Sequence, residues 1–234
     1  SRDDVSKTLR KISGFDNREK EYKDYAASVD ARLTYLTELK DKFPADYSTA
    51  YDREQYSSSE DELAALTKLK DDLKKRQTLT PPPFDSVFIF GDDINDVIMI
   101  GSTLLYFDVR PENARFIGTS QLANSKVYAE RALKGAVFPL ASTKYSAKFD
   151  FAFEKYFGRA PNKLASLAYD AVALLASLPE PTAAEIASPD GFAGINGAFR
   201  FMGAAAERNM DIMEIVGGTK GAKVVSPASA RFMD

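Results

Sequence analysis

The chain has 234 residues, of which 44% are hydrophobic and 28% are charged, as expected for one large or two modest globular domains. It contains no cysteine and no histidine, which excludes disulfides, thiolate zinc sites and histidine-based catalytic triads. A net charge of -3 argues against a nucleic-acid surface, because phosphate binding needs an excess of lysine and arginine. No apolar run reaches the roughly 18 residues of a membrane-spanning helix, so no transmembrane segment is expected.

Residues 1–80 are predicted to form a charged helical hairpin that extends from the rest of the chain. Apolar side chains recur at the helical steps of three and four at Tyr22, Tyr25, Val29, Leu33, Leu36, Leu39 and Phe43. Pro44 is expected to end this helix. A second helix is predicted to begin with a capping box formed by Ser59 and Glu62. Such a hairpin is either a solvated excursion from a domain or an arm that binds a partner.

Residues 81–145 change to the pattern of an α/β core. Residues 84–90 are typical of a strand that is buried on both faces. A helix is expected directly after Gly91, and residues 115–118 follow as a second strand at the spacing of one strand–helix–strand unit. Another helix is expected over 121–133 and a third strand over 135–140. This alternation predicts an α/β fold with a doubly wound parallel sheet.

The last two regions are predicted to be helical over 146–188 and antiparallel over 189–234. The apolar stripe of Leu164, Leu167, Ala171 and Leu174 is expected to be partly uncovered, or covered by another copy of the chain. Strands are expected at 197–201, 211–216 and 222–225, where they complete the sheet. The glycine-rich segment 217–221 lacks the spacing of a phosphate loop and is predicted to be a hairpin turn.

Candidate ligand-binding residues follow from the strand order. Ligands of open α/β sheets bind beyond the carboxyl ends of parallel strands, where loops and helix N-termini gather hydrogen-bond donors. The residues expected at two such ends are Gly91, Asp92, Asp93, Thr119, Ser120 and Gln121. Helix capping is the alternative role for each of them. The aspartates near residue 93 lack the spacing of a calcium loop, so no metal site is predicted. No cofactor or catalytic residue is predicted either, and we expect no enzymatic activity.

Four segments together carry a resemblance to a known superfamily. They are FDSVFIFGDDINDVIMIGSTLLYFDVRPENARFIGTSQL, KGAVFPL, FEKYFGRAPNKLASLAYDAVALLASL and GFAGINGAFRF. Over about residues 81–225 the chain resembles the type I periplasmic-binding-protein superfamily. Within it, the chain is similar to the leucine-binding-protein-like group that includes the penicillin-binding-protein activators. The LAYDAVALLASL helix followed by the GFAGINGAFRF hairpin is the most specific part of the resemblance.

The resemblance implies two lobes with a ligand between them, of which this chain holds largely the second. It also implies a periplasmic protein, with a lipid anchor on an upstream segment as an option. Two functions follow from it. The first is a non-enzymatic module that regulates or docks on a cell-envelope partner such as a peptidoglycan synthase. The second is the substrate-binding component of an ABC transporter, which would deliver an amino acid or another small polar solute to a permease.

Overall fold

The computed structural model describes residues 2–232, with Lys163 described by its backbone alone. The chain divides into two compact units. Among the described residues, 2–87 and 98–115 form the first unit, and 88–97 and 116–232 form the second. Each has its own buried core, with Leu36 and Leu104 in the first unit and Phe116 and Phe138 in the second.

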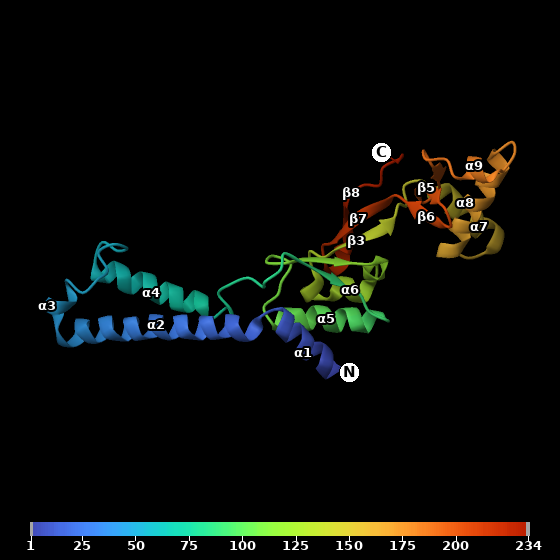
Figure 1. Ribbon diagram of the computed structural model, residues 1–234. Helices are drawn as coiled ribbons and strands as arrows, with labels where there is room; N and C mark the ends of the chain where they lie inside the picture. The colour runs from blue at the N-terminus through green and yellow to red at the C-terminus, as the bar shows by residue number, and fades with distance from the viewer. Residues whose placement is uncertain (1, 233–234) are drawn as a thin grey trace. The chain divides into compact units, whose positions relative to one another are not determined.

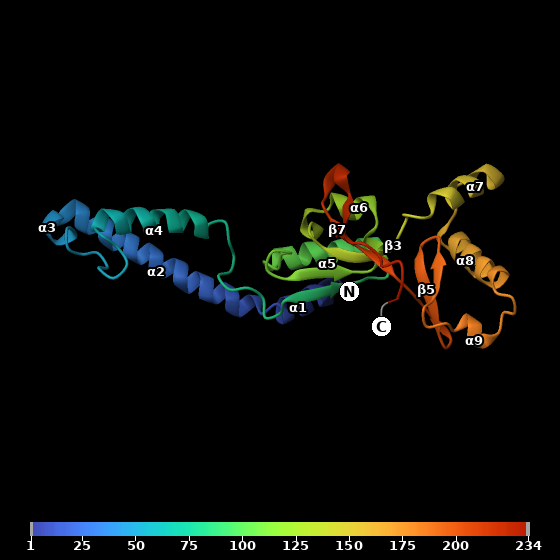
Figure 2. The same cartoon turned by 90° about the horizontal axis from the view of Figure 1, so that it is seen from above.

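The predicted helical hairpin is confirmed in the first unit. α2 (Phe15–Lys42) and α4 (Ser59–Leu73) lie side by side, as Figures 1 and 2 show from two directions. Pro44 ends α2 as expected and also begins the short helix α3 (Pro44–Tyr47). The helix α1 (Arg2–Ile12), which the sequence pattern did not predict, precedes the hairpin. Gly14 joins α1 to α2 with a φ of 63°, a left-handed conformation that glycine adopts without strain.

An apolar seam holds the two long helices of the hairpin together. Its buried side chains are Val29, Leu36, Tyr47, Leu66 and Leu73. Partly buried side chains from both helices, Leu33 and Leu63 among them, pack around this core. Because full burial of a large aliphatic side chain contributes roughly 1.5–3 kcal/mol, the seam is the main source of stability of the hairpin.

A buried ion pair connects α2 to α4 beside this seam. The Glu62 side chain is only 3% exposed and accepts hydrogen bonds from Nε of Arg32 at 2.6 Å and from Nη2 at 3.0 Å. The backbone N–H of Asp52 donates to the same carboxylate at 2.8 Å. The hydrogen bond from Arg32 is the main cause that lowers the pKa of Glu62. The carboxylate is therefore held in its charged form by donors from two separate segments.

The N-terminus of α4 differs from the sequence prediction by one residue. The N-cap is Ser58, whose Oγ accepts a hydrogen bond from the backbone N–H of Asp61 at 3.1 Å. The predicted capping box of Ser59 and Glu62 is thus wrong. Ser59 donates its hydroxyl to the carbonyl oxygen of Tyr47, and Glu62 is engaged by Arg32. Tertiary partners have taken both side chains away from a local capping role.

Arg18 is a buried cation that connects several segments of the first unit. It is 5% exposed, and burial lowers the pKa of its guanidinium. Its nitrogens donate to the carbonyl oxygens of Ser13, Thr80, Phe107 and Asp108 at 2.8–3.3 Å and to Oγ1 of Thr78 at 2.9 Å. The Thr78 hydroxyl in turn donates to Oδ2 of Asp108 at 2.7 Å. The planar guanidinium can satisfy this many acceptors because it carries five N–H donors in a fixed arrangement.

Most of a five-stranded sheet with the strand order β1-β2-β3-β7-β8 lies in the second unit, while Ser86, Val87 and Arg115 of this sheet belong to the first. The strands span Ser86–Ile89, Arg115–Gly118, Val137–Ala141, Met210–Ile215 and Ala222–Ser226, respectively. β2 and β3 are parallel, with Ile117 opposite Val137. β7 pairs antiparallel with both β3 and β8. The α/β class is confirmed, as are the antiparallel strands beside the parallel pair and the hairpin turn at 217–221.

The connections between the first strands follow the prediction in part. α5 (Ile94–Tyr106) begins after Gly91 as expected. The single helix predicted over 121–133 is wrong, because this stretch forms η1 (Ser120–Leu122), α6 (Ser125–Ala129) and η2 (Arg131–Leu133). The side chains of Asn124 and Glu130 accept hydrogen bonds from N–H groups two residues ahead. Each therefore starts a new turn and interrupts the preceding one.

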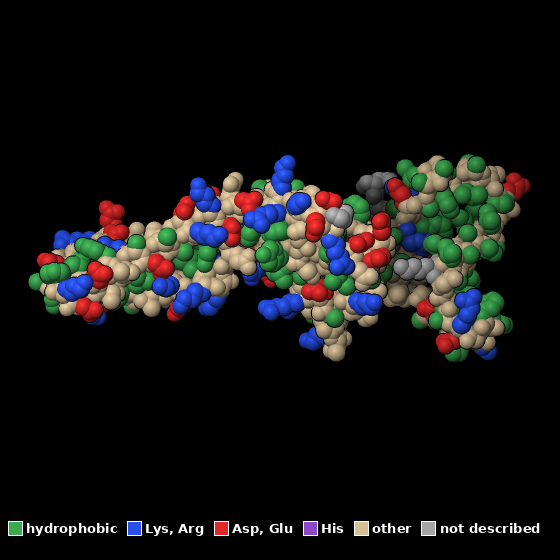
Figure 3. Space-filling model, turned by 90° about the horizontal axis from the view of Figure 1, so that it is seen from below, with side chains coloured by type: hydrophobic (Ala, Val, Ile, Leu, Met, Phe, Trp, Pro, Cys, Tyr) green, Lys and Arg blue, Asp and Glu red, His purple; other side chains and the backbone are tan. Residues whose placement is uncertain are grey.

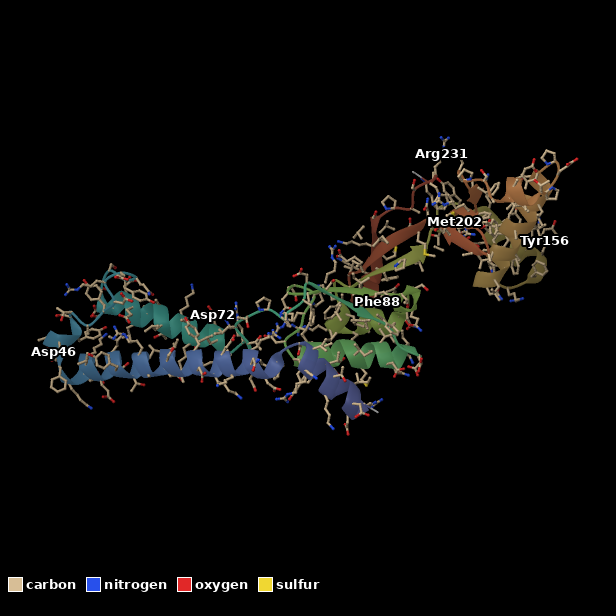
Figure 4. All side chains as sticks on the ribbon, in the orientation of Figure 1. Asp46, Asp72, Phe88, Tyr156, Met202 and Arg231 are labelled. Atoms are coloured by element: carbon tan, nitrogen blue, oxygen red, sulfur yellow. The ribbon has the colours of Figure 1, made fainter. Side chains whose placement is uncertain are left out.

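β1 is buried on one face, whereas the sequence predicted burial on both. Ile89 is 2% exposed, but its neighbours Phe88 and Phe90 are 57% and 64% exposed, and Figure 4 labels Phe88 on this strand. β1 stands at an edge of the sheet, and side chains alternate between the two faces of a strand. A continuous apolar run is therefore compatible with an edge strand that has one uncovered face.

The last strands do not all join the main sheet. β4 (Phe192–Gly194), β5 (Gly197–Met202) and β6 (Ala205–Arg208) form a separate three-stranded antiparallel sheet. The prediction that residues 197–201 complete the main sheet is thus wrong. Two-residue turns join β5 to β4 and to β6, and such short turns favour local pairing because little loop entropy is lost. α7 (Ala147–Phe157), α8 (Lys163–Ser177) and α9 (Ala183–Ile186) belong to the same unit.

Candidate ligand-binding cavity

The second unit contains a cavity of about 580 Å³, which lies within the range of small-molecule pockets. Its walls come from α8, from the hairpin of β4 and β5, from the loop after β3, from the start of β7 and from residues 227–230. The aromatic lining residues are Tyr145, Tyr169, Phe192 and Phe199. The charged lining residues are Lys144, Asp170 and Asp211. Apolar walls with a few polar groups are the usual composition of a small-molecule site.

Asp170 is the most deeply buried charged group of this lining. It is 4% exposed, and its Oδ1 accepts a hydrogen bond from the backbone N–H of Ile195 at 2.8 Å. Its Oδ2 lies 2.8 Å from Nη2 of Arg208. Arg208 also donates to the carbonyl oxygen of Gly197 at 3.2 Å, and its guanidinium carbon lies 4.9 Å from the ring centroid of Phe199. This pair connects α8, the β4–β5 turn and β6 at one wall of the cavity.

Two buried oxygen atoms on or beside this wall lack a hydrogen bond within residues 2–232, although one of them is ion-paired. Despite its short distance to Arg208, Oδ2 of Asp170 makes no hydrogen bond of good geometry with the described residues. The Oδ1 atom of Asn196, in the adjacent turn, is also buried and has no hydrogen-bond partner among them. Buried acceptors are almost always satisfied in native proteins. Of these two atoms, Asp170 Oδ2 has a cationic partner in Arg208, and Asn196 lies outside the cavity lining.

The turn at this wall depends on two glycines. A Cβ atom on Gly194 would lie 2.5 Å from Oδ2 of Asp170, so only glycine allows the β4–β5 hairpin to approach α8 this closely. Gly197 has a φ of 107°, and a Cβ atom there would lie 2.6 Å from the carbonyl oxygen of Asn209. Local backbone geometry therefore positions the acceptor wall.

The remaining charged lining residues stand elsewhere around the cavity. Oδ1 of Asp211, at the start of β7, accepts a hydrogen bond from the backbone N–H of Ala228 at 2.7 Å, which fixes the 227–230 segment beside the strand. Nζ of Lys144 lies 5.2 Å from the ring centroid of Tyr145. The cavity thus combines a cation over an aromatic ring with two carboxylates, one of which is already paired with Arg208.

The sequence-predicted site residues lie outside this cavity lining. The structure brings two of them together, because Nε2 of Gln121 donates to the carbonyl oxygen of Gly91 at 3.1 Å. Asp93 caps α5, with Oδ1 accepting from the N–H groups of Asn95 and Asp96. Thr119 caps the η1 turn through a bond from the Gln121 N–H at 3.3 Å. Asp92 and Ser120 are neighbours of these caps in the chain, and a ligand role for all six residues stays a prediction.

Sequence reasoning missed the residues that do line the cavity. Asp170 is a single acidic residue in an otherwise apolar helical stretch, and the pattern assigned that stretch to core packing. Its position at the buried side of α8, with Ser166 and Leu174 one turn away on either side, was a usable signal. A lone carboxylate at helical spacing with buried neighbours requires a partner. Its partner, Arg208, lies 38 positions further along the chain (208 − 170), beyond any local pattern.

Membrane-spanning helices and metal sites are two other features that the described residues could form. Among residues 2–232, no helix is long and apolar enough to cross a membrane. Within the same part of the chain, no group of three or more acidic side chains is placed to hold a metal ion.

Comparisons with known proteins give partial likenesses. No family model matches the chain, and no curated protein matches it. The chain is similar to the crystal structure of an extracellular ligand-binding receptor from Rhodopseudomonas palustris HaA2, with 16% identity and a TM-score of 0.40 over 73% of this chain and 60% of that one. It is also similar to a solute binding protein of an ABC transporter from Rhodopseudomonas palustris BisB5 in complex with 3,4-dihydroxy benzoic acid, with 16% identity, a TM-score of 0.35 and coverage of 76% and 58%. The chain thus spans about three-fifths of the length of these structures. The narrower resemblance to penicillin-binding-protein activators stays a prediction.

Proposed function

We propose that the chain is a non-enzymatic binding module that holds a small polar solute in the cavity of its second unit. The observation that carries the proposal is the cavity itself, which combines aromatic walls with the carboxylates of Asp170 and Asp211 and the ammonium group of Lys144. A solute that fits carries an ammonium or amide group toward the lining carboxylates of Asp170 and Asp211. Its apolar part packs against Phe192 and Phe199. An amino acid or a similar small amine has this chemistry.

The resemblance read from the sequence places such a module in a transport system. A solute-binding component of an ABC transporter, located in the periplasm, is the setting that this resemblance implies. The whole protein's substrate, permease partner and location are parts of the proposal. The cavity supports only its first step, which is reversible binding without bond-making.

Calorimetry and thermal unfolding against a panel of amino acids, small amines and aromatic acids test the binding step. A solute that binds only the folded chain must raise its melting temperature. The blocking variant is Ala173→Trp, because Ala173 lies on α8 in the cavity lining. The matched control is Ala176→Trp on the same helix, outside that lining. Binding that survives in the control and is lost in the blocking variant supports the proposal. If both variants bind the solute equally well, the solute binds elsewhere. If no member of the panel binds, the proposal is contradicted.

The helical hairpin favours a second candidate function, which is docking on a protein partner of the cell envelope such as a peptidoglycan synthase. The hairpin has its own core and buried ion pair, and Phe43 beside its α3 end is 56% exposed. Figure 4 labels Asp46 and Asp72, which lie near the two ends of the paired helices. If the α3 end is the contact, Phe43→Glu abolishes retention of the partner. Tyr25→Glu, which lies within α2 and is 43% exposed, leaves it intact. Equal retention of both variants contradicts docking through this end.

A further inference from the structure

The outer face of α8 is apolar, uncharged and exposed. The buried side of this helix carries Ser166, Asp170 and Leu174, so the cavity wall uses its polar side. The opposite face is formed by Leu164, Leu167, Ala168, Ala171, Val172 and Leu175. Of its large side chains, Leu164 is 72% exposed, Val172 67%, Leu175 48% and Leu167 47%. Figure 3 shows hydrophobic side chains gathered over the part of the molecule at the right of the view, which holds α8.

This face has the spacing of a helix-packing surface. Its members recur at i, i+3, i+4, i+7, i+8 and i+11, which is the pattern by which a helix buries one side against another element. From the sequence, Leu164, Leu167 and Ala171 were expected to be partly uncovered or covered by another copy, and all three are exposed in the structure. Leu174 belongs to the other side of the helix and is buried.

The order of side chains along the face is symmetric about its midpoint. Leu164 and Leu175 stand at equal distances from a point between residues 169 and 170. The same holds for Leu167 with Val172 and for Ala168 with Ala171. A contact across a two-fold axis requires the same patch on both copies, with residue i against j and j against i. Antiparallel helices related in this way would place leucine against leucine at the ends and alanine against alanine at the centre.

We propose that this face is the contact of a symmetric homodimer, in which α8 of a second copy packs antiparallel against it. The central alanines allow the helix axes to approach to the short end of the usual 8–10 Å. A fully exposed large residue is taken to have an accessible area of about 175 Å², a value within the range that aromatic side chains bury. With the exposed fractions above and the two alanines, the accessible area of the face is then roughly 500 Å² per copy. Two copies then bury roughly 1,000 Å², which is the lower limit for a specific interface. A contact at this lower limit of area is expected to be weak and concentration-dependent.

Sedimentation velocity of the full chain from about 1 to 100 µM, a range in which weak dimers form and dissociate, tests the proposal. The wild type is expected to shift from monomer to dimer within the range. Ala171→Glu places an unpaired charge at the centre of the contact on both copies and should weaken the dimer at least about 100-fold. Ala176→Glu puts the same charge on α8 outside both this face and the cavity lining and should leave the dimer unchanged. A folded wild-type chain that stays monomeric at all concentrations overturns the proposal and leaves the face to a different polypeptide.

Disulfide trapping tests the antiparallel arrangement itself. The chain has no native cysteine, so each introduced thiol reports one position. An equimolar mixture of Ala168→Cys and Ala171→Cys proteins should form the mixed disulfide in preference to either homodimeric one, because only the mixed pair lies opposite across the axis within disulfide range. Preferential 168–168 cross-links would indicate parallel helices and overturn the symmetry argument.

Discussion

Replacing Asp170 with alanine is expected to destabilise the second unit more than any surface substitution. The change removes the counter-ion that lies 2.8 Å from Arg208, whose side chain is 12% exposed, and it also removes the acceptor of the Ile195 N–H. Leaving one member of a buried ion pair without its partner costs about 3–5 kcal/mol. With an m-value of about 2 kcal/mol/M, this corresponds to a fall in the urea midpoint of about 1.5–2.5 M.

A local fluorescent probe makes this measurement specific to the second unit. The chain has no tryptophan, so Tyr169→Trp on α8, where the native side chain is 50% exposed, reports unfolding of this unit alone. The double variant Asp170→Ala/Arg208→Met should recover most of the lost stability, because an apolar replacement of both charges is often near neutral. A midpoint for Asp170→Ala within 0.3 M of the parent, about the uncertainty of such midpoints, would refute the claim that the pair organises this wall.

Three further predictions concern the remaining structure. The pKa of Glu62 is lowered in the folded chain, so its contribution to stability is present above the unfolded pKa of about 4.3 and is lost as the pH falls through the folded pKa. Urea midpoints of the hairpin, measured by circular dichroism between pH 3 and 7, should show this loss. The Glu62→Gln variant should show a weaker dependence of the midpoint on pH. Arg18→Met should destabilise the first unit by about 3 kcal/mol, because it leaves buried carbonyl oxygens without donors. Arg18→Lys should recover only part of the lost stability in the same denaturation assay. An unchanged urea midpoint for Arg18→Met would contradict the role of Arg18 in connecting these segments. Gly197→Ala should lower the free energy of unfolding by about 1–2 kcal/mol or more, because the φ of this residue is 107°. Gly158→Ala, at a φ of 66° with nothing near the added Cβ, should lower it less. Thermal unfolding of the two variants measures the difference.

The elements that were predictable from sequence are those whose signals are local. The apolar stripe of α2 repeats over many turns, so its packing against α4 could be expected before the structure was known. The short strands near Ile117 and Val137 were likewise marked by β-branched residues between turn signals. The cap of α4 was misplaced by one residue because Ser58 and Ser59 are equally good cap residues. Only the distant partners Arg32 and Tyr47 decide between them.

The candidate site was beyond local patterns for a physical reason. Its acceptor wall joins Asp170, Ile195 and Arg208 from three separate elements, and no spacing rule connects them. The predicted residues Gly91 and Gln121 do meet at the ends of neighbouring strands, so the expectation about the sheet edge was sound in its geometry. The carbonyl oxygen of Gly91 and the side chain of Gln121 bond to each other, and the side chains of Asp93 and Thr119 cap local turns. Capping was the alternative that the sequence had left open.

Backbone amide chemical shifts during titration with the best solute of the panel test the central claim most directly, because they report where the solute binds as well as whether it binds. The account predicts that the largest shift changes occur at Asp170, Phe192, Ile195 and Phe199 in the cavity wall. Changes concentrated at Gly91, Thr119 and Gln121 instead would contradict it and would return the binding site to the carboxyl ends of the parallel strands.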